Sequence, residues 1–231
     1  MSQINFTNLS KLSYRTNEAY KALRTNIQFC GSNIKSICIT SCLPNEGKSN
    51  VSFNLARSLA ESGKKVIFID ADLRKSILVG KYRPDQAVIG LSHYLSGQNG
   101  IDEILYETNI ENLDIIFTGT MPPNPAELLS SDIFGDLLKI FRKVYDYIII
   151  DTPPIGSVID SAIVAQKCDG VVLVIEANSI SYKIAQRAIR QLAKSESRIL
   201  GAVLNKYDYK RQYSGYENKK YKKYLNYYSG Y

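Results

Sequence analysis

The sequence predicts an α/β fold in which helices cover both faces of a doubly wound, mainly parallel sheet. Short apolar runs, such as Val171-Val172-Leu173-Val174-Ile175, are continuous rather than alternating, as in strands buried on both faces. Segments with helical spacing lie between these runs. The 231 residues are 45% hydrophobic, which suffices for one sizeable core. We therefore expect a single folded domain.

The expected elements alternate along the chain, which is typical of βαβ units. We expect strands at 36–40, 66–69, 113–117, 147–150, 171–175 and 200–204. We expect helices at 48–62, 88–105, 125–143, 158–167 and 181–195. Pro125 suits the first position of its helix, with Asn124 as the cap.

A further amphipathic helix is expected before the first strand, at about 14–30. Ala19, Leu23 and Ile27 recur every four residues on one side of it, as on a helix with one apolar face. In its simplest role this helix covers an edge of the sheet.

The segment S-C-L-P-N-E-G-K-S at 41–49 follows a strand and opens a helix, which is the context of a phosphate-binding loop. Gly47 lets the backbone approach phosphates, Lys48 would reach the β- and γ-phosphates, and Ser49 would bind Mg²⁺. The first glycine of the usual pattern is replaced by Cys42.

The predicted nucleotide-binding residues are Pro44, Asn45, Glu46, Gly47, Lys48, Ser49, Asn50 and Asn205. Together, loop and sheet predict a fold of the P-loop NTPase type. Asn205 ends the last strand, where its amide could read a base edge or simply cap the strand.

Three aspartates come at the ends of strands. Asp151 ends I-I-I-D-T-P-P, a Walker B pattern, and Asp70 and Asp72 lie in I-D-A-D-L-R. Beside a phosphate loop these carboxylates indicate Mg²⁺-nucleotide chemistry. We expect Ser49, Asp72 and Asp151 around the metal, with Lys48, Asp70 and Asp72 as catalytic residues. Asp70 is assigned to the acceptor hydroxyl, although its role and that of Asp72 could be exchanged.

Arg74 and Lys75 follow directly. They could clamp phosphates or form a solvated surface turn.

Tyrosines crowd the end of the chain. The last 25 residues contain nine of them, with few aliphatic residues for a phenol ring to pack against. We divide the chain into a folded domain, 1–206, and a disordered tail, 207–231. A flexible chain of 25 residues spans ~25–30 Å, so a neighbouring subunit is within reach. The expected phosphate acceptors are Tyr213, Tyr216, Tyr221, Tyr224, Tyr227, Tyr228 and Tyr231.

Composition excludes several classes of protein. Residues 206–231 carry seven basic and two acidic residues, five of the chain's seven net positive charges, so the folded domain is close to neutral. A nucleic-acid-binding surface is therefore not expected there. One histidine and four cysteines without a C-x-x-C pair argue against zinc. No signal peptide and no apolar run of ~18 residues is evident. We expect a cytoplasmic protein with reduced thiols.

These motifs resemble one family, the bacterial tyrosine kinases of capsule and exopolysaccharide synthesis, in the free-standing form of Gram-positive bacteria. The resemblance spans almost the whole chain. It is carried by E-A-Y-K-A-L-R at 18–24, the phosphate loop, I-D-A-D-L-R-K, P-P-N-P-A-E-L-L, I-I-I-D-T-P-P, L-N-K and the tyrosine tail.

The resemblance implies an ATP·Mg²⁺-dependent kinase that phosphorylates its own tail, and a ring-shaped oligomer. Given the reach of the tail, we expect each tail in such a ring to be phosphorylated in trans, by the next subunit. The resemblance also implies recruitment to the inner face of the membrane by the cytoplasmic segment of a polysaccharide co-polymerase adaptor, and a cognate tyrosine phosphatase. The family's ring-forming E-x-x-R-x-x-R motif corresponds to Glu18, Lys21 and Arg24, with Lys21 replacing an arginine. Asn45 replaces a loop glycine, and asparagine tolerates the left-handed backbone better than most residues.

Two alternatives have different sequence signatures. A partitioning ATPase of the MinD and ParA type would carry a lysine early in the loop, where this chain has Leu43, and has no use for a tyrosine tail. A nucleic-acid-binding module could use lysines interleaved with tyrosines, but the rest of the chain carries no recognisable nucleic-acid-binding motif.

Overall fold

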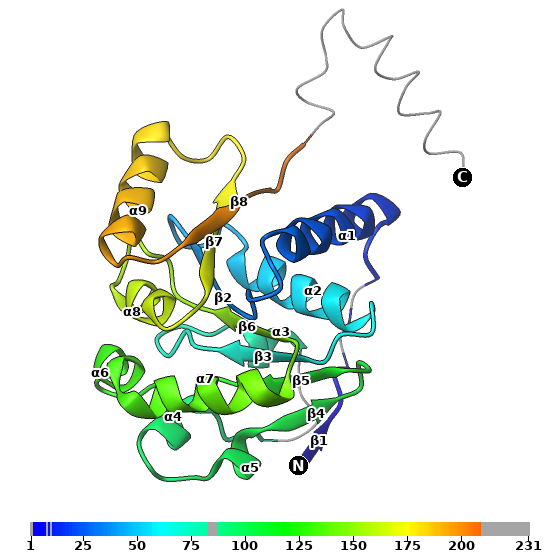
Figure 1. Ribbon diagram of the computed structural model, residues 1–231, viewed down its shortest axis with the longest axis vertical. Helices are drawn as coiled ribbons and strands as arrows, with labels where there is room; N and C mark the ends of the chain where they lie inside the picture. The colour runs from blue at the N-terminus through cyan, green and yellow to red at the C-terminus, as the bar shows by residue number, and fades with distance from the viewer. Residues whose placement is uncertain (1, 8, 10, 83–86, 209–231) are drawn as a thin grey trace, which may run out of the picture.

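An eight-stranded sheet forms the centre of the protein in the computed structural model, which describes residues 2–7, 9, 11–82 and 87–208 (Figure 1). The strand order is β1-β4-β5-β3-β6-β2-β7-β8. The strands are β1 (Ser2–Ile4), β2 (Ser36–Ser41), β3 (Val66–Asp70), β4 (Tyr106–Thr108), β5 (Leu113–Ile116), β6 (Tyr147–Asp151), β7 (Gly170–Glu176) and β8 (Ile199–Asn205).

All strand pairs are parallel except β4 with β5. Every residue of β2, β3 and the end of β6 is buried, as expected for central strands covered on both faces. Parallel pairing aligns the carboxyl ends of β2, β3 and β6, and in this register Asp70 faces Asp151. The predicted doubly wound, mainly parallel sheet is confirmed.

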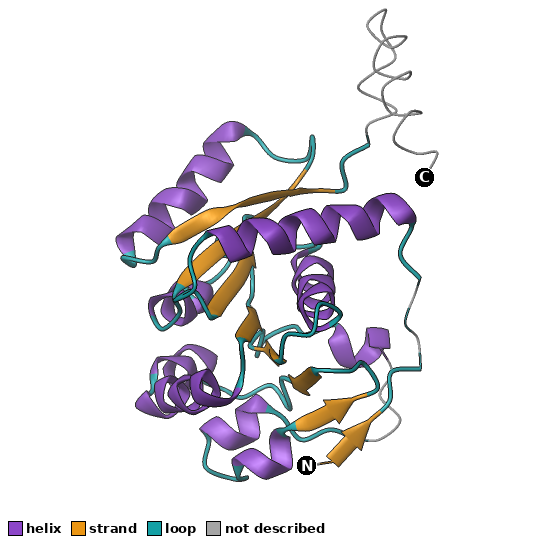
Figure 2. Cartoon of the chain, turned by 45° about the vertical axis from the view of Figure 1, so that its right-hand side comes forward, coloured by secondary structure: helices purple, strands orange, loops and turns teal. Residues whose placement is uncertain are grey.

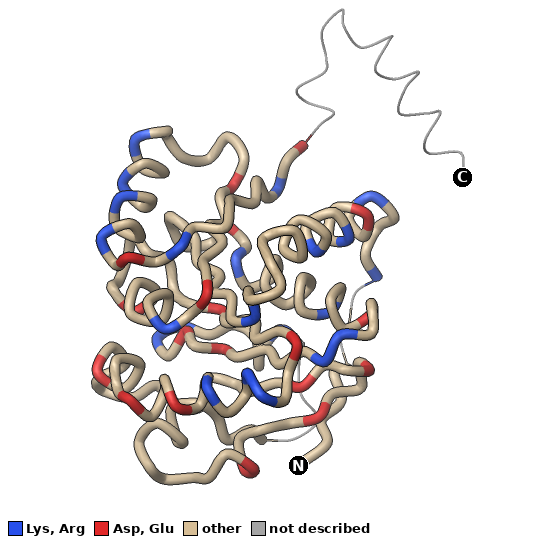
Figure 3. Tube along the Cα trace, viewed as in Figure 1, with Lys and Arg blue, Asp and Glu red and all other residues tan. Residues whose placement is uncertain are grey.

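Helices cover both faces of the sheet (Figure 2). They are α1 (Tyr14–Phe29), α2 (Lys48–Ala60), α3 (Leu78–Tyr82), α4 (Leu91–Leu95), α5 (Ile101–Ile104), α6 (Pro125–Ser130), α7 (Asp132–Val144), α8 (Asp160–Gln166) and α9 (Tyr182–Lys194). Residues of α1, α2 and α3 share one buried cluster, whereas residues of α4 to α9 belong to the other. Figure 3 shows both signs of charge along these flanking helices, with basic positions grouped on α9.

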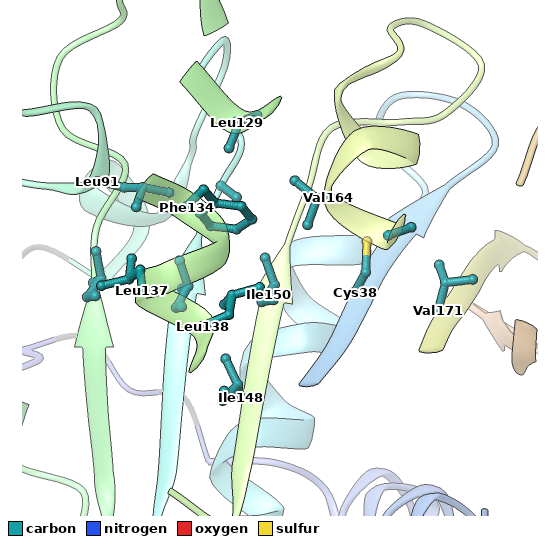
Figure 4. Close-up of a cluster of buried hydrophobic side chains, with 14 of the residues drawn as sticks. Cys38, Leu91, Leu129, Phe134, Leu137, Leu138, Ile148, Ile150, Val164 and Val171 are labelled. Carbon is teal, nitrogen blue, oxygen red and sulfur yellow. The ribbon is translucent and has the colours of Figure 1, made fainter. Parts of the chain in front are cut away.

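The larger core cluster lies between the sheet and the helices α7 and α8 (Figure 4). Phe134 and Leu138 of α7 lie on the side of the helix that faces β6 with Ile148 and Ile150, and these four residues are at most 2% exposed. Full burial of such a side chain contributes about 1.5–3 kcal/mol. This packing holds β6, and with it Asp151, rigidly in place.

The sequence overestimated the length of two helices. The expected helix at 88–105 is wrong: α4 ends before Gly97, which adopts a left-handed φ of 74°, and α5 starts anew after Gly100. The expected helix at 125–143 is interrupted at Ser131, whose ψ of 157° is extended. The predicted start of this helix is confirmed, with Asn124 at the N-cap position and Pro125 as the first helical residue, but the Asn124 side chain makes no capping hydrogen bond and donates to Glu127 instead.

The short elements β1, β4 and α3 were not expected, because three to five residues carry too little periodicity to be recognised. The helix expected at about 14–30 is α1. Among the described residues no helix is long and apolar enough to span a membrane.

Candidate active site

The phosphate loop connects β2 to α2 through two residues in left-handed conformation. Asn45 has a φ of 66° and Gly47 a φ of 88°. Asn45 thus occupies the geometry for which a glycine would be chosen, and asparagine accepts it at low cost. Alternating left- and right-handed residues turn successive N–H groups toward one point, which forms an anion-binding concavity. The left-handed Asn45 agrees with the expectation that asparagine tolerates this conformation in place of the family's glycine.

Hydrogen bonds connect the phosphate loop to the neighbouring strands. The buried Glu46 accepts hydrogen bonds from the N–H groups of Leu43, at 2.7 Å, and Glu176, at 3.2 Å. From the end of β8, the Asn205 amide donates to the Glu46 carbonyl at 2.8 Å. Asn205 therefore contacts the loop itself, and its contact with a base stays a prediction.

Lys48 lies among the predicted carboxylates. Its Nζ is 3.0 Å from Asp72 Oδ2 and 3.6 Å from Asp151 Oδ2, and 3.2 Å from Ser49 Oγ. Asp151 also accepts from Ser52 at 3.1 Å. The structure thus brings together the residues to which the sequence assigned metal binding and phosphate contact.

The cluster holds more carboxylates than cations. Burial beside Asp151 raises the pKa of Asp70 to about 8, and burial likewise raises the pKa of Asp151 despite the nearby Lys48. Burial alone would lower the pKa of Lys48, but Asp151 and Asp72 raise it above its usual value. The site therefore lacks positive charge.

Asp70 already has partners for both oxygens. Its Oδ1 accepts from the N–H of Asp72 at 3.3 Å, and its Oδ2 accepts from the hydroxyl of Ser76. Ser76 was not found from the sequence, since it belongs to no motif and its contact arises only from the turn between β3 and α3. Since a carboxylate oxygen can accept more than one hydrogen bond, an incoming hydroxyl would either share Asp70 with Ser76 or replace it.

Arg74 and Lys75 behave differently from each other. The Arg74 guanidinium makes two bonds, of 2.8 and 3.0 Å, to the fully buried Asp160. The N–H of Lys75 bonds to Asp72 Oδ1 at 3.0 Å. Both residues nevertheless line the cavity of about 390 Å³ beside the phosphate loop, together with Pro154 and Lys206. Arg74 is thus oriented by a buried carboxylate at the edge of the cavity.

The residues present suit a magnesium ion. Two carboxylates, Asp72 and Asp151, and the Ser49 hydroxyl are hard oxygen ligands beside the loop. Among the described residues no three acidic, histidine or cysteine side chains form a metal cage. Mg²⁺ needs no such cage, because it keeps several waters and takes phosphate oxygens as ligands.

The predicted ring-forming residues lie on α1. Glu18 pairs with Lys21 at 2.8 Å, both well exposed. Arg24 is half-buried and donates to the Ser58 carbonyl of α2 at 2.7 Å, which docks α1 against α2. The predicted acceptor tyrosines, Tyr213 to Tyr231, lie outside the described residues.

Comparison with known proteins is decisive for the family. Residues 34–206 match the family model described as an AAA domain. The chain is 44% identical over 192 residues to tyrosine-protein kinase CpsD of Streptococcus agalactiae, covering 83% of this chain and 84% of that protein. It is 40% identical over 190 residues to tyrosine-protein kinase YwqD of Bacillus subtilis, covering 81% and 80%.

The chain belongs to the bacterial tyrosine-protein kinase family. Solved structures agree. The chimerical protein CapA2B2 matches with a TM-score of 0.78 and 32% identity, over 82% of this chain and 84% of that one. The kinase domain of the Escherichia coli tyrosine kinase ETK matches with a TM-score of 0.77 and 33% identity, over 83% and 77%.

The predictions of a protein-tyrosine kinase and of its capsule-associated family are thereby confirmed. The septum site-determining protein MinD of Pyrococcus horikoshii shares the fold at a TM-score of 0.63 and 26% identity, covering 75% of this chain and 71% of that one. This tyrosine kinase is therefore built on the same sheet as the ATPases that the sequence left as an alternative, but is more similar to the kinases.

Proposed function

We propose that this kinase transfers the γ-phosphoryl group of ATP to tyrosines of its own C-terminal segment, in trans within a ring. The observation that carries the proposal is the buried cluster of Lys48, Asp72 and Asp151 at the phosphate loop, with Asp70 next to it. Phosphoryl transfer needs positioning and charge neutralisation more than covalent chemistry, and this cluster is suited to both.

The loop and Lys48 would hold the phosphates. The N–H groups of Gly47, Lys48 and Ser49 are at the start of α2, where the helix favours negative charge. On binding, Lys48 would exchange its contacts with Asp72 and Asp151 for the β- and γ-phosphate oxygens. The two carboxylates and Ser49 would then be free to hold Mg²⁺, which supplies neutralisation of the charge that develops on the transferred group.

Asp70 would receive the tyrosine proton. A phenol has a pKa of about 10. Because the pKa of Asp70 is raised to about 8, its ionised form is a stronger base than an ordinary aspartate, and only that ionised form, the minority at neutral pH, would accept the proton. The carboxylate would accept the proton as the phenol oxygen attacks phosphorus and the bond to ADP breaks. Asp72, bonded to Lys48, is better placed for the metal.

The acceptors are proposed from the sequence. Seven tyrosines at 213–231 follow the folded domain, and the chain leaves it at the end of β8 beside the phosphate loop. A 25-residue segment with random-coil statistics spans ~25–30 Å, which exceeds the ~17 Å radius of gyration expected for a domain of this size. A neighbour's site is within that reach, and α1 with Glu18, Lys21 and Arg24 is proposed as the ring contact.

Two partners are proposed with this function. The first is a membrane-bound co-polymerase adaptor, whose cytoplasmic segment would activate the kinase and recruit it to the membrane. The second is a cognate tyrosine phosphatase. Both rest on the family resemblance. The solved relative CapA2B2 is described as a chimerical protein.

Intact mass measurement tests the activity. After incubation with Mg·ATP and an adaptor fragment, we expect a ladder of 80 Da additions that a tyrosine phosphatase removes. A protein that binds ATP and hydrolyses it without any such addition would instead support the MinD-type alternative.

A mixing experiment tests transfer in trans. A Lys48→Met chain with its native tail is combined with an active chain whose seven acceptor tyrosines are changed to phenylalanine. Phosphotyrosine on the Lys48→Met chain is expected, and its absence would argue for transfer in cis.

A further inference from the structure

The first residue after β8, Lys206, contacts the phosphate loop from outside. Its Nζ donates to the Asn45 carbonyl at 2.7 Å and pairs with Glu176 Oε2 at 2.9 Å. The neighbouring Asn205 donates to the Glu46 carbonyl at 2.8 Å. Two consecutive loop carbonyls are therefore held by two consecutive residues from the far end of the chain.

These bonds orient the peptide groups of the loop. In a trans peptide the C=O and the following N–H point in opposite directions, and the described chain has no cis peptide. When the carbonyls of Asn45 and Glu46 point out toward β8, the N–H groups of Glu46 and Gly47 point the other way, into the loop. Among the described residues, these two N–H groups have no acceptor.

Asn205 packs closely against Gly47 of the loop. A Cβ added to Gly47 would lie 2.2 Å from Asn205 Nδ2, so Asn205 fits only against a glycine. Glu46 closes the arrangement, because its carboxylate accepts from the N–H of Glu176, whose own carboxylate holds Lys206. Four residues of three separate segments thus fix one loop conformation.

We propose that Lys206 is a positioning residue for nucleotide binding, which aims the N–H groups of Glu46 and Gly47 at the phosphates. This inference rests on the nucleotide-binding part of the proposed function. A preorganised loop binds phosphate without first losing conformational freedom, so Lys206 acts mainly on affinity. Lys206 directly precedes the tyrosine-rich segment, so nucleotide binding at the loop would also affect where the first residues of that segment lie. Coupling of this kind is reciprocal, so the position of those residues would affect nucleotide affinity as well.

The test compares full-length variants in their binding of a fluorescent ADP analogue with Mg²⁺. Lys206→Ala is expected to weaken binding about tenfold, equivalent to ~1.4 kcal/mol, since it removes a charge-assisted bond. Lys206→Arg, which keeps charge and donors, is expected to restore most of the affinity. Lys183→Ala on the exposed side of α9 is the matched control and should bind like the wild type.

A second variant reaches the same contact from the other side. Glu176→Gln removes the carboxylate that holds Lys206 and is expected to weaken binding about threefold. Combined with Lys206→Ala it should add little, because both changes act on one contact. This variant also tests the proposal should Lys206→Ala fold poorly.

Two further measurements separate positioning from general stability. The KM for ATP in Lys206→Ala should rise about tenfold, with the rate at saturating ATP within twofold of wild type. ADP should slow amide hydrogen exchange at 204–208 in the wild type and less so in Lys206→Ala.

Equal ADP affinity of Lys206→Ala and wild type, or a reduced maximal rate at unchanged KM, would overturn the inference. Absence of ADP binding by the wild type would instead overturn the nucleotide site of the proposed function.

Discussion

The two ends of the sheet each hold a group of charged side chains, and the two groups are balanced differently. At the carboxyl end, Asp70, Asp72 and Asp151 surround one cation, Lys48. At the amino end, Asp169 accepts from the N–H groups of Lys35 and Ser36, from the Ser36 hydroxyl and from Arg142. The first group has three carboxylates for one cation, whereas in the second group a single carboxylate has an arginine and three further donors.

The pKa values record this difference. Although burial alone would raise it, Arg142 and the donors of Ser36 and Lys35 hold the pKa of Asp169 below its usual value. Burial beside another carboxylate raises the pKa of Asp70 to about 8. The neutralised Asp169 is what a structural ion pair would show, whereas the raised pKa values of Asp70 and Asp151 are what the proposed reaction would need. The comparison predicts which end matters for activity and which for stability.

The largest expected effect comes from the lysine of the carboxyl end. Lys48→Met should lower phosphotyrosine formation at least about 100-fold, because a preorganised cation contributes on this scale. Its thermal unfolding should stay cooperative, since the buried carboxylates can take up protons. Phosphotyrosine quantified by mass, beside circular dichroism on the same sample, checks both. Activity within tenfold of wild type would remove Lys48 from the catalytic machinery.

The corresponding change at the amino end should act on stability instead. Arg142→Met is expected to lower the free energy of unfolding by about 1–2 kcal/mol, a modest value because Arg142 is 35% exposed. Lys139→Met, on the same helix and in a pair that is largely exposed, is the control and should change little. Urea denaturation measures both, and kinase activity at 25 °C should be unchanged in each.

The pH dependence of stability should have opposite sign at the two ends. The lowered pKa of Asp169 stabilises the folded state above its usual value of 3.8 and is lost as pH falls through the folded pKa. Asp169→Asn should therefore be less stable than wild type at pH 6, by about 1 kcal/mol. This deficit should shrink below about pH 4, and a deficit independent of pH would contradict the assignment.

For Asp70 the raised pKa favours the protonated folded state. Its contribution is fully present below pH 3.8 and is lost as pH rises toward about 8. In metal-free buffer with chelator, the wild type should lose about 2–3 kcal/mol more than Asp70→Asn between pH 6 and 8.5, because each pH unit below the folded pKa of about 8 corresponds to ~1.4 kcal/mol. Urea midpoints at the two pH values give the comparison, and parallel losses would show that Asp70 does not titrate in this range.

The smallest effect is expected at Asn45. Replacing it by glycine relieves the left-handed φ of 66° but raises the entropy of the unfolded loop, so the two effects nearly cancel. Asn45→Gly should change ADP affinity by about twofold or less. A tenfold change would mean that the asparagine side chain itself takes part in binding.

Much of the carboxyl end could be predicted from the sequence, and little of the amino end. Lys48, Asp70 and Asp151 are recognisable because a phosphate loop and strand-terminal aspartates have fixed spacings and a shared sheet edge. The contacts of Ser76 and Lys206 could not be predicted, because they depend on how the turn after β3 and the end of β8 pack against the site. Asp169 and Arg142 are far from Ser36 in sequence and follow no motif. Short elements such as β4, and the breaks at Gly97 and Ser131, were missed because periodicity is weak over so few residues.

The position of β2 in the sheet also sets the order in which the protein can fold. Its neighbours are β6 and β7, so the strand that carries the phosphate loop pairs only with segments made more than about 100 residues later. Such non-local pairing slows folding and leaves apolar strands exposed on a growing chain. While it is being synthesised, the chain can assemble the nucleotide site only after residue 151, and the Lys206 contact only after β8. The nucleotide site can therefore form only after most of the sheet has been synthesised.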